Sequence, residues 1–551
     1  MRIIFPLLFI LCLSESISAQ GFNAFFNIAP ASAPFRNTGA RGVVFLDSNA
    51  LFWGNHTSQF PRTLHTYIAK LSPTGNVLWS LTLGDSGQHM NAVGSRGVTK
   101  LRNGKFLLLP WEFLGNPMGF DTYGITHLMW VNENGQLMRR VKLTDSIQGK
   151  YISECVELQN GDLLCTGKIT STLNELHSSG SFAWRAHWLV RFDSLGQVIW
   201  EKTFSRRYVG ISQGDWPYMD RIQGIGDSMF VVSGYKIDSP RVRIWSCFAA
   251  FDQNGNPKWE RFIHGQNGLA YGFEMNSEAV PMGDSLWFFV TTLSDTLYPG
   301  PGGVPTFHSN LRGIYGYLNN QGDTLRVKNV QSRYPTNQYK QTSADQAQIL
   351  PDGSKLILFG LSIDGTHSQI TAIQKLNTND ELQWERWYVY DSAQHYIQHN
   401  FEYGMSAAPN GSIYLAGTYE VLNNTAGDST GTFAWVSRTD SFGCVVPGCH
   451  LGDSIFSTPT SLPVVQYPQA LEVKLYPNPA QSQVTIEILG EDLPSGLLAS
   501  VFNYSGQQVV PEQMLLDGKA QLDLTALPAG LYLCRLRSDK GVVTYRKLVK
   551  Q

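Results

Sequence analysis

The sequence predicts an all-β protein, a seven-bladed β-propeller followed by a small C-terminal β-sandwich. Three observations lead to this class. A pattern of strand, glycine turn and strand returns seven times, at intervals of about 60 residues, and a second hairpin signal lies between successive copies. After the last copy, a stretch rich in Ser, Thr and Pro separates a new series of short strands from the repeats.

The first hairpin has a glycine at its turn in every copy but one and, in four copies, a tryptophan four residues after the turn position. The first copy shows this pair as Gly75 and Trp79. The pair returns as Gly196 with Trp200 and Gly255 with Trp259, whereas Arg139 replaces Trp after Gly135, no Trp follows Gly322, and Asp380 replaces Gly before Trp384. The last copy, "FAWVSRTDSFGCVV", is decayed. We interpret the tryptophan as a residue that packs between neighbouring repeats.

The second hairpin of each copy is marked by turn residues in segments such as "VTKLRNGKFLLLP" and "ILPDGSKLILFG". Asn-Gly and Asp-Gly tolerate a positive φ, so they favour the tight turns of β-hairpins. Two hairpins give four strands per copy, and no helical periodicity interrupts them. Because such a sheet is apolar on both faces, it must pack against neighbouring sheets. A ring of seven blades buries both faces of every sheet.

The N-terminal residues are expected to close this ring. The segment "NTGARGV" from Asn37 parallels "NAVGSRGV" from Asn91, so residues 22–28 correspond to the outer strand of a blade. The last copy lacks that strand after Cys444. We therefore predict that the N-terminal strand completes the C-terminal blade, and that deletion of residues 21–30 lowers thermal stability.

Apolar residues make up 42% and charged residues 16% of the chain, and the net charge is −2 without a sustained Lys/Arg run. This balance predicts a folded protein that binds neither nucleic acid nor anionic lipid. Residues 1–19 are predicted to be a signal peptide, because Arg2 precedes an apolar stretch from Ile3 to Leu13 and small residues follow. We expect cleavage before Gln20, with a cut before Ala19 as the alternative. No later run of about 18 apolar residues occurs, so no transmembrane segment is expected.

Six cysteines follow the predicted signal peptide: Cys155, Cys165, Cys247, Cys444, Cys449 and Cys534. Export permits disulfides. Cys444 and Cys449 lie close together in "GCVVPGCHL", which favours a disulfide or structural thiols. A metal site is the alternative, but these two cysteines and His450 lack a second ligand pair.

Two short motifs resemble catalytic patterns. The segment "GISQG" around Ser212 matches a nucleophile elbow, but no helix is predicted after it. His395 and His399 are spaced as in a zinc-protease helix, but no Glu follows His395. We interpret both as polar loops, and we predict no catalytic residue, no metal and no cofactor.

The ligand-binding loops of a propeller are its long connections. The long inserts of this chain are residues 170–187, 205–219, 295–312 and 388–402. The aromatic residues in or beside them are Trp184, Trp188, Tyr208, Trp216, Tyr218 and Tyr298. Aromatic platforms suit sugars or proteins, and all of these except Trp188 are our candidate binding residues. Burial in the core is the alternative for each.

The propeller is predicted to span residues 20–450 and a linker residues 451–470, and a separate domain is predicted at 471–551. That domain opens with "YPNP", in which Pro477 and Pro479 restrict the backbone. Short strands follow, including "LDLTALPAGLYLCRL" and the terminal "TYRKLVK". The whole segment resembles the type A C-terminal sorting domain of cargo of the bacterial type IX secretion system. The residues that match are Tyr476, Pro477, Asn478, Pro479, Gly530, Tyr532, Lys547 and Lys550. Cys534 departs from the pattern, because an ordinary strand residue is expected there.

This resemblance implies that the signal peptide directs the chain across the inner membrane. It also implies that the type IX machinery recognises the C-terminal domain for passage to the cell surface or the medium. Residues 40–445 are similar to the repeats of quinoprotein-type propellers, which implies a quinone cofactor and calcium. The adjacent cysteines of those enzymes are absent, so we predict neither cofactor.

We therefore expect a non-enzymatic cargo protein whose propeller binds a glycan or a protein, or forms part of the cell surface. The alternative is a secreted hydrolase- or quinoprotein-like enzyme with its site at the channel mouth. An enzyme should bring several Asp, Glu, His or Arg side chains together there, whereas a binder should expose an aromatic strip.

Overall fold

The computed structural model divides into two compact units, residues 1–29 with 33–464 and residues 30–32 with 465–551. The structure describes residues 22–27, 37–57, 64–83, 89–91, 96–114, 123–143, 148–172, 184–208, 216–238, 243–263, 277–299, 305–333, 339–363, 369–389, 404–422, 429–445, 456–457, 465–466, 472–489, 496–503, 508–516, 518–538 and 541–551. These residues form strands and turns and no helix, and therefore no helix that could cross a membrane. The predicted signal peptide, residues 1–19, lies outside them.

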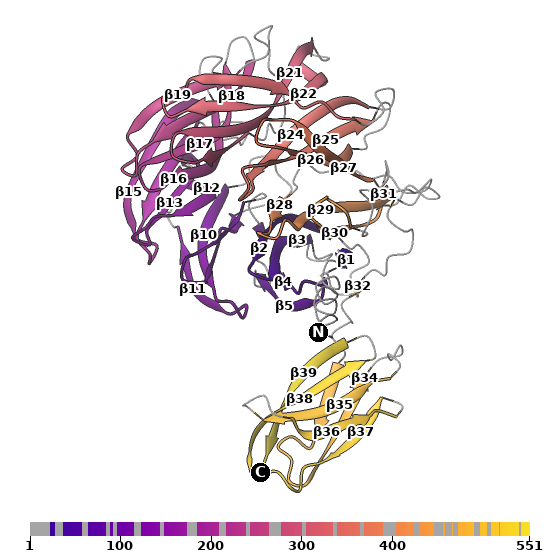
Figure 1. The fold of residues 1–551 in the computed structure, drawn as a ribbon. Coiled ribbons are helices and arrows are strands. Elements are labelled where there is room, and N and C mark those ends of the chain that lie inside the picture. The colour runs from indigo at the N-terminus through magenta and orange to yellow at the C-terminus, as the bar shows by residue number, and fades with distance from the viewer. Residues whose placement is uncertain are drawn as a thin grey trace, which may run out of the picture. The chain divides into compact units, whose positions relative to one another are not determined.

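The first half of the first unit contains three sheets (Figure 1). The first is β2 (Asn37–Leu46), β3 (Asn49–Thr57), β4 (Leu64–Leu71) and β5 (Val77–Leu83). In the second, β10 (Tyr123–Val131) pairs with β11 (Leu137–Lys142) on one side and with β8 (Phe106–Leu108) and β9 (Trp111–Leu114) on the other. β7 (Val98–Lys100) pairs with β8, and β6 (His89–Asn91) pairs with β9. The third is β12 (Gln148–Glu157), β13 (Leu163–Thr172), β14 (Trp184–Phe192) and β15 (Val198–Tyr208).

Four further sheets follow in chain order. The fourth is β16 (Trp216–Ile225), β17 (Met229–Asp238), β18 (Arg243–Phe251) and β19 (Pro257–Ile263). The fifth is β20 (Glu278–Met282), β21 (Leu286–Pro299), β22 (Pro305–Asn319) and β23 (Thr324–Asn329). The sixth is β24 (Tyr339–Ile349), β25 (Lys355–Ile363), β26 (Gln369–Leu376) and β27 (Leu382–Val389). The seventh is β28 (Gly404–Ala407), β29 (Ile413–Leu422), β30 (Ser429–Thr439) and, from the other end of the unit, β1 (Phe22–Asn27).

Along the chain, the described strands pair mainly antiparallel in groups that correspond to the sequence copies, most of them with four strands, and single parallel bridges join β10 to β12 and β2 to β30. Buried apolar clusters lie between successive sheets. One cluster joins Trp53 of β3 to Met129 of β10, and another joins Phe288 of β21 to Phe359 of β25. Each sheet therefore buries both faces against its neighbours, as the apolar strands require. The β-propeller class predicted from the repeats is confirmed.

The repeated tryptophan packs against the turn of the following sheet. A Cβ built on Gly135 would lie 2.6 Å from the Trp79 ring, and Trp79 Nε1 donates a hydrogen bond to the Glu133 carbonyl at 2.8 Å. The same contact joins Trp130 to Gly196, Trp200 to Gly255, Trp259 to Gly322 and Trp384 to Gly443. In the second sheet, Trp130 of β10 makes this contact, because Arg139 occupies the usual tryptophan place on β11. The prediction that the tryptophans pack between repeats is confirmed.

The N-terminal strand closes the ring, as predicted. β1 pairs antiparallel with β30, with Phe22 opposite Arg438. The seventh sheet contacts the first, because Arg438 Nη1 donates to the Pro73 carbonyl at 2.8 Å and the Phe45 amide donates to Ser406 Oγ at 3.0 Å. Strands β2–β5 and β28–β30, from opposite ends of the repeats, consequently lie side by side (Figure 1).

Part of the predicted linker forms a strand. β31 (Phe456–Ser457) pairs parallel with β27, the outer strand of the sixth sheet. The edge of β27 has unpaired backbone groups, and an extended segment can satisfy them. The remaining linker residues, apart from β32 (Val465–Gln466), lie outside the described part of the chain.

The second unit is a β-sandwich, as predicted. One sheet contains β33 (Glu472–Tyr476), β34 (Gln483–Leu489) and β37 (Lys519–Asp523). The other contains β35 (Leu498–Asn503), β36 (Gln508–Met514), β38 (Gly530–Ser538) and β39 (Gly541–Lys550). Both sheets contribute to one buried cluster, in which Ile486 of β34 and Leu536 of β38 are fully enclosed.

Candidate functional site

Charged side chains converge between the first strands of the sheets, which contact one another around the centre of the propeller. Arg96 precedes β7 and pairs with Glu278 of β20, and its Nε lies 4.0 Å from Glu154 Oε1 of β12. Both carboxylates are buried, and each accepts a backbone N–H of the next sheet, Glu154 from Ile222 and Glu278 from Ala347. Burial raises the pKa of Glu154 to about 7. Because these oxygens already bind neighbouring backbone, we assign the cluster to joining the sheets.

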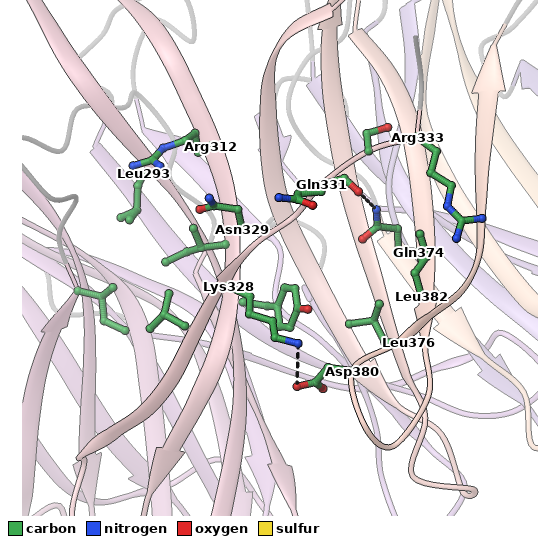
Figure 2. A pocket seen from close by; sticks show the side chains of 15 residues that line it. Leu293, Arg312, Lys328, Asn329, Gln331, Arg333, Gln374, Leu376, Asp380 and Leu382 are labelled. Carbon is green, nitrogen blue, oxygen red and sulfur yellow. Dashed lines mark hydrogen bonds and ion pairs between the residues drawn. The ribbon is translucent and has the colours of Figure 1, made fainter. Parts of the chain in front are cut away.

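A groove of about 890 Å³ lies at the outer strand β23, between the fifth and sixth sheets (Figure 2). Val327 and Asn329 line it from one face of β23 and Lys328 from the other. The other lining residues are Ile263, Leu293, Arg312, Ile314, Tyr315, Gln331, Ser332, Arg333, Gln374, Leu376, Asp380 and Leu382. This volume lies within the range of about 300–1,000 Å³ that is usual for small-ligand sites.

The carboxylate of Asp380 lies in the wall of this groove. Its Oδ1 accepts hydrogen bonds from Tyr317 and, at 2.9 Å, from Lys355 Nζ. Its Oδ2 pairs with Arg326 Nη1 at 3.2 Å and with Lys328 Nζ at 3.9 Å. Burial opposes ionisation of Asp380, but these hydrogen bonds and positive charges hold its pKa below the ordinary value. Burial, and then the hydrogen bond to Asp380, raise the pKa of Tyr317.

We call the contact between two successive sheets a seam. The seam between the fifth and sixth sheets departs from the repeated packing of tryptophan on glycine. Asp380 occupies the turn position that glycine holds in the other copies, with a φ of 64°. Arg326 occupies the tryptophan position of the preceding copy. A charged cluster around the buried pair of Asp380 and Lys355 therefore replaces the contact of tryptophan on glycine at the seam that forms the groove. Sequence analysis identified both departures, but it did not connect them with a site.

The groove is predominantly cationic. Arg312, Lys328 and Arg333 line it, and Asp380 is the only carboxylate among the described lining residues. Behind the lining, the Glu385 carboxylate accepts hydrogen bonds from Gln374 Nε2 at 2.8 Å and from the Arg333 backbone amide at 3.1 Å. Gln374 Nε2 also donates to the Gln331 carbonyl at 2.7 Å, as Figure 2 shows. The side chains of Asn329, Gln331 and Ser332 add neutral polar groups to the lining.

The aromatic candidates from the sequence lie on strands, although loops were expected. Trp184 of β14 and Tyr208 of β15 are direct cross-strand partners, and Tyr218 of β16 is opposite Tyr235 of β17. Trp216 begins β16, and Tyr298 lies near the end of β21. Long hairpins therefore replace part of the expected loops, because these segments continue the backbone pairing of their sheets. A binding role for these residues stays a prediction.

Trp188, which sequence analysis placed beside the same inserts, is a core residue. It is 1% exposed and donates from Nε1 to Glu201 Oε2 at 3.0 Å. Ser212, His395 and His399 lie outside the described residues. In the described part of the chain, no group of three or more His, Cys, Asp or Glu side chains could hold a metal ion.

The cysteines include one disulfide that sequence analysis missed. Cys155 and Cys165 are cross-strand partners in β12 and β13 and are joined by a disulfide. Their positions are symmetric about Asn160 at the turn of the hairpin, and this symmetry was the available signal. Cys444 is disulfide-bonded, and Cys449, its predicted partner, lies outside the described residues.

The predicted sorting residues are distributed over both sheets of the second unit. Tyr476 ends β33, and its hydroxyl donates to Glu487 Oε2 at 2.9 Å. Pro477 and Pro479 follow cis peptide bonds, and Asn478 Oδ1 accepts the Val549 amide at 2.9 Å. The remaining residues are on β38 and β39: Gly530 opposite Lys550, Tyr532 opposite Leu548, and Lys547 opposite Leu533.

Cys534 of β38, which departs from the family pattern, is a free buried thiol. Burial raises its pKa to about 12, so the group stays a neutral thiol in the folded domain. It fills space in the sandwich core as a small apolar residue would.

Residues 474–551 match the family described as the secretion system C-terminal sorting domain. They form a sorting domain of the type IX secretion system, and the chain is cargo that this system exports to the cell surface or the extracellular space. A comparison with curated proteins found no match.

Several solved structures are similar to this chain. An acylaminoacyl peptidase of Pyrococcus horikoshii is 9% identical, with a TM-score of 0.37. The match covers 83% of this chain and 59% of the peptidase. This chain therefore spans less than two thirds of the peptidase's length. The β-propeller domain of the Trilobed protease from Pyrococcus furiosus is 10% identical with a TM-score of 0.36, over 73% of this chain and 94% of that domain. The GH93 α-L-arabinofuranosidase of Fusarium graminearum is 11% identical with a TM-score of 0.38, over 62% and 91% of the two chains. At these identities the likeness concerns the fold alone.

Proposed function

We propose that the propeller is the functional cargo and that it binds an acidic glycan, without catalysis, in the groove at β23. The observation that carries this proposal is the charge of the groove. Three cationic side chains, Arg312, Lys328 and Arg333, line the space, and the carboxylate of Asp380 is already neutralised by its own partners. A net positive groove favours a ligand that carries carboxylates.

The neutral side chains of the groove favour a sugar over a simple anion. The amides of Asn329 and Gln331 can exchange hydrogen bonds with sugar hydroxyls, and the Ser332 hydroxyl, whose proton is donated to Glu385, can accept one. Apolar side chains, among them Leu376 and Leu382, form the rest of the wall. Such a mixture of apolar wall and a few placed polar groups is typical of ligand sites.

The state of the carboxylates favours binding over hydrolysis. General acid–base catalysis needs a carboxyl group that can approach the reacting atom and exchange its proton. Both oxygens of Asp380 are held by cations or by Tyr317, and Glu385 is buried and hydrogen-bonded to Gln374. Neither group is available for such an exchange.

Calorimetric titration of the purified full chain with alginate, a polymer of uronic acids, tests the proposal. The expected result is saturable binding that weakens as salt is added, because the attraction is electrostatic. Replacement of Lys328 and Arg333 together by Gln should weaken binding about tenfold or more, because two charge-assisted contacts are lost.

The matched control is Lys258→Gln with Arg261→Gln, a lysine and an arginine of β19 that do not line the groove. This pair should leave alginate affinity unchanged, and neutral dextran should not bind at the same concentrations. Absence of alginate binding by the wild-type chain, or equal loss in both double variants, would overturn the proposal.

A further inference from the structure

A second cavity, of about 420 Å³, lies between the third and fourth sheets. His187 of β14 and Phe204 of β15 line it from the third sheet. Met219 of β16, Phe251 of β18 and Glu260 of β19 line it from the fourth. It has no lining residue in common with the groove at β23, so the two spaces are separate. Its volume suits a single small molecule.

Three rings from the two sheets contribute to the wall of this cavity. His187 and Phe204 are cross-strand partners, and their ring centroids are 5.7 Å apart. The Phe251 ring lies 5.0 Å from Phe204 and 6.3 Å from His187. Met219 and Ala249, each 4% exposed, extend the apolar surface. Flat aromatic molecules pack well on such rings, in offset or edge-to-face contacts.

His187 adds one polar atom to this apolar wall. Its side chain is 1% exposed, and its Nε2 donates to Thr166 Oγ1 at 2.9 Å, because Thr166 gives its own proton to the Met219 carbonyl. With the hydrogen on Nε2, Nδ1 of the neutral ring is an acceptor, and it has no hydrogen-bond partner among the described residues. A buried acceptor without a partner lacks the hydrogen bond that water would give it. A ligand that donates to Nδ1 would restore that bond.

The charges around the cavity favour a neutral ligand. Lys258 and Glu260, both exposed on β19, are the two charged side chains among the described lining residues, and their charges are opposite. Deeper in the cavity, the lone pair of His187 Nδ1 would repel a carboxylate. Burial of an anion there would cost free energy without a compensating cation. An acidic glycan, the ligand proposed for the groove at β23, is therefore unsuited to this cavity.

We propose that the cavity between the third and fourth sheets binds a neutral phenol. The hydroxyl of the phenol donates its hydrogen to His187 Nδ1, and the aromatic ring packs against Phe204 and Phe251. An aliphatic alcohol would offer the donor without the ring contacts, and an aromatic hydrocarbon would offer the ring without the donor. This site does not depend on the function proposed for the groove.

Calorimetric titration of the purified full chain with 4-methylphenol tests the proposal. The titration is done at about pH 7.5, well below the pKa of about 10 that a phenol has in water. Saturable binding is expected. 4-Methylanisole has nearly the same shape but no donor, so it should bind about tenfold more weakly or worse. Absence of saturable 4-methylphenol binding, or equal affinity for the two compounds, would overturn the proposal, and both results come from the wild-type chain.

The variant His187→Phe removes the acceptor and keeps an aromatic ring in the wall. It should weaken 4-methylphenol binding about tenfold and leave the affinity for 4-methylanisole unchanged. The matched control is His127→Phe, a buried histidine of β10 whose Nε2 is 2.9 Å from Glu112 Oε2 and whose Nδ1 accepts from Arg140 Nε at 3.0 Å. This control should keep both affinities. A preference for 4-methylphenol that survives in His187→Phe, or is lost equally in both variants, would contradict the assigned hydrogen bond.

A further variant separates this site from the groove at β23. Lys328→Gln with Arg333→Gln changes two residues that line the groove and not the cavity. It should therefore bind 4-methylphenol as the wild-type chain does, whatever its affinity for alginate. Weaker 4-methylphenol binding by this variant would place the phenol in the groove and overturn the assignment to the cavity.

Discussion

Phe22 of β1 packs on Gly75, in the turn between β4 and β5, where the seventh sheet meets the first. A Cβ built on Gly75 would lie 2.8 Å from the Phe22 ring, and Phe22 is opposite Arg438 as Trp79 is opposite Lys70. Phe22 therefore occupies the tryptophan place of the seventh sheet. With Arg326 and Asp380 at the fifth seam, each seam between the described sheets has one side chain on the turn of the following sheet, from an outer strand except at the second seam, where Trp130 of β10 makes the contact.

The closing contact predicts a loss of stability in Phe22→Ala. The ring is half-buried, so the free energy of unfolding should fall by about 1–2 kcal/mol, less than for a fully buried phenylalanine. Thermal and urea unfolding of the purified chain measure this change, and Phe22→Trp should restore stability. An unchanged melting temperature in Phe22→Ala would contradict closure through this contact.

A double-mutant cycle separates the contact from backbone strain. Gly75→Ala places a Cβ against the Phe22 ring at a φ of 83°, so it should destabilise by both a clash and an unfavourable backbone conformation. In the Phe22→Ala background the clash disappears and only the backbone cost, about 1 kcal/mol, should remain. Additive effects of the two substitutions would show that the residues are not in contact.

We predict that Asp380→Gly, which restores the glycine found at this turn in the other copies, lowers the free energy of unfolding. Asp380→Gly relieves a positive φ but leaves Lys355, which is fully buried, without its carboxylate. Loss of one partner of a buried pair typically costs about 3–5 kcal/mol, so the net destabilisation should be roughly 2–4 kcal/mol. Urea unfolding of the purified variant measures it.

Asp47 is the matched control, because it is the other aspartate with a positive φ among the described residues and its side chain is 93% exposed. Asp47→Gly loses only an exposed pair with Lys100, so its stability should stay within about 0.5 kcal/mol of wild type or rise slightly. Similar losses at the two positions would mean that the buried cluster adds nothing to the turn.

The disulfide between Cys155 and Cys165 predicts a stability that depends on redox state. Replacement of both cysteines by Ala should lower the free energy of unfolding by roughly 2–3 kcal/mol, because the bond closes a short loop in the unfolded chain. A reducing agent under unfolding conditions should lower the stability of the wild-type chain by that much more than the stability of the double variant, which keeps the disulfide of Cys444. Equal sensitivity of both proteins would place the redox effect at another cysteine.

The repeats made the fold predictable, because the packing of an aromatic side chain on a turn glycine recurs at most of the seams. Trp79 and Gly75 could be interpreted from one sequence, since the same spacing returns at Trp200 and Trp259. The role of Asp380 could not, because it depends on Lys355 from a different hairpin and on Arg326 from the preceding sheet. These partners meet only when the sheets are packed.

The disulfide and the positions of the aromatic candidates could not be predicted from the sequence for a similar reason, because both depend on how strands pair. Pairing of Cys155 with Cys165 depends on the register of a hairpin, which the Asn-Gly turn indicates but does not determine alone. The extent of β14 and β21 depends on partner strands that continue beyond the usual blade, so residues expected in loops lie in sheets. The sorting domain was the most readable part, because its motifs follow one another in the family's order.

His187 predicts a loss of stability in acid. This histidine is buried between β14 and its neighbours, and its Nε2 is 2.9 Å from Thr166 Oγ1. Thr166 donates its own proton to the Met219 carbonyl, so Nε2 carries a hydrogen and donates it to Thr166, and burial keeps the ring neutral. Burial lowers its pKa from 6.5 to about 3.

The folded state therefore binds the His187 proton more weakly than the unfolded state. Above pH 6.5 both states are neutral and the site adds no pH dependence. As the pH falls from 6.5 toward 3, the unfolded chain gains the proton first, and stability should fall by about 1.4 kcal/mol per pH unit from this site. Glu154 acts in the opposite sense between pH 4.5 and 7, because its pKa is raised in the folded state. The contribution of His187 must therefore be taken from the difference between wild type and His187→Gln. That difference should shrink as the pH is lowered, and a difference that stays constant between pH 7 and 4 would contradict a neutral buried imidazole.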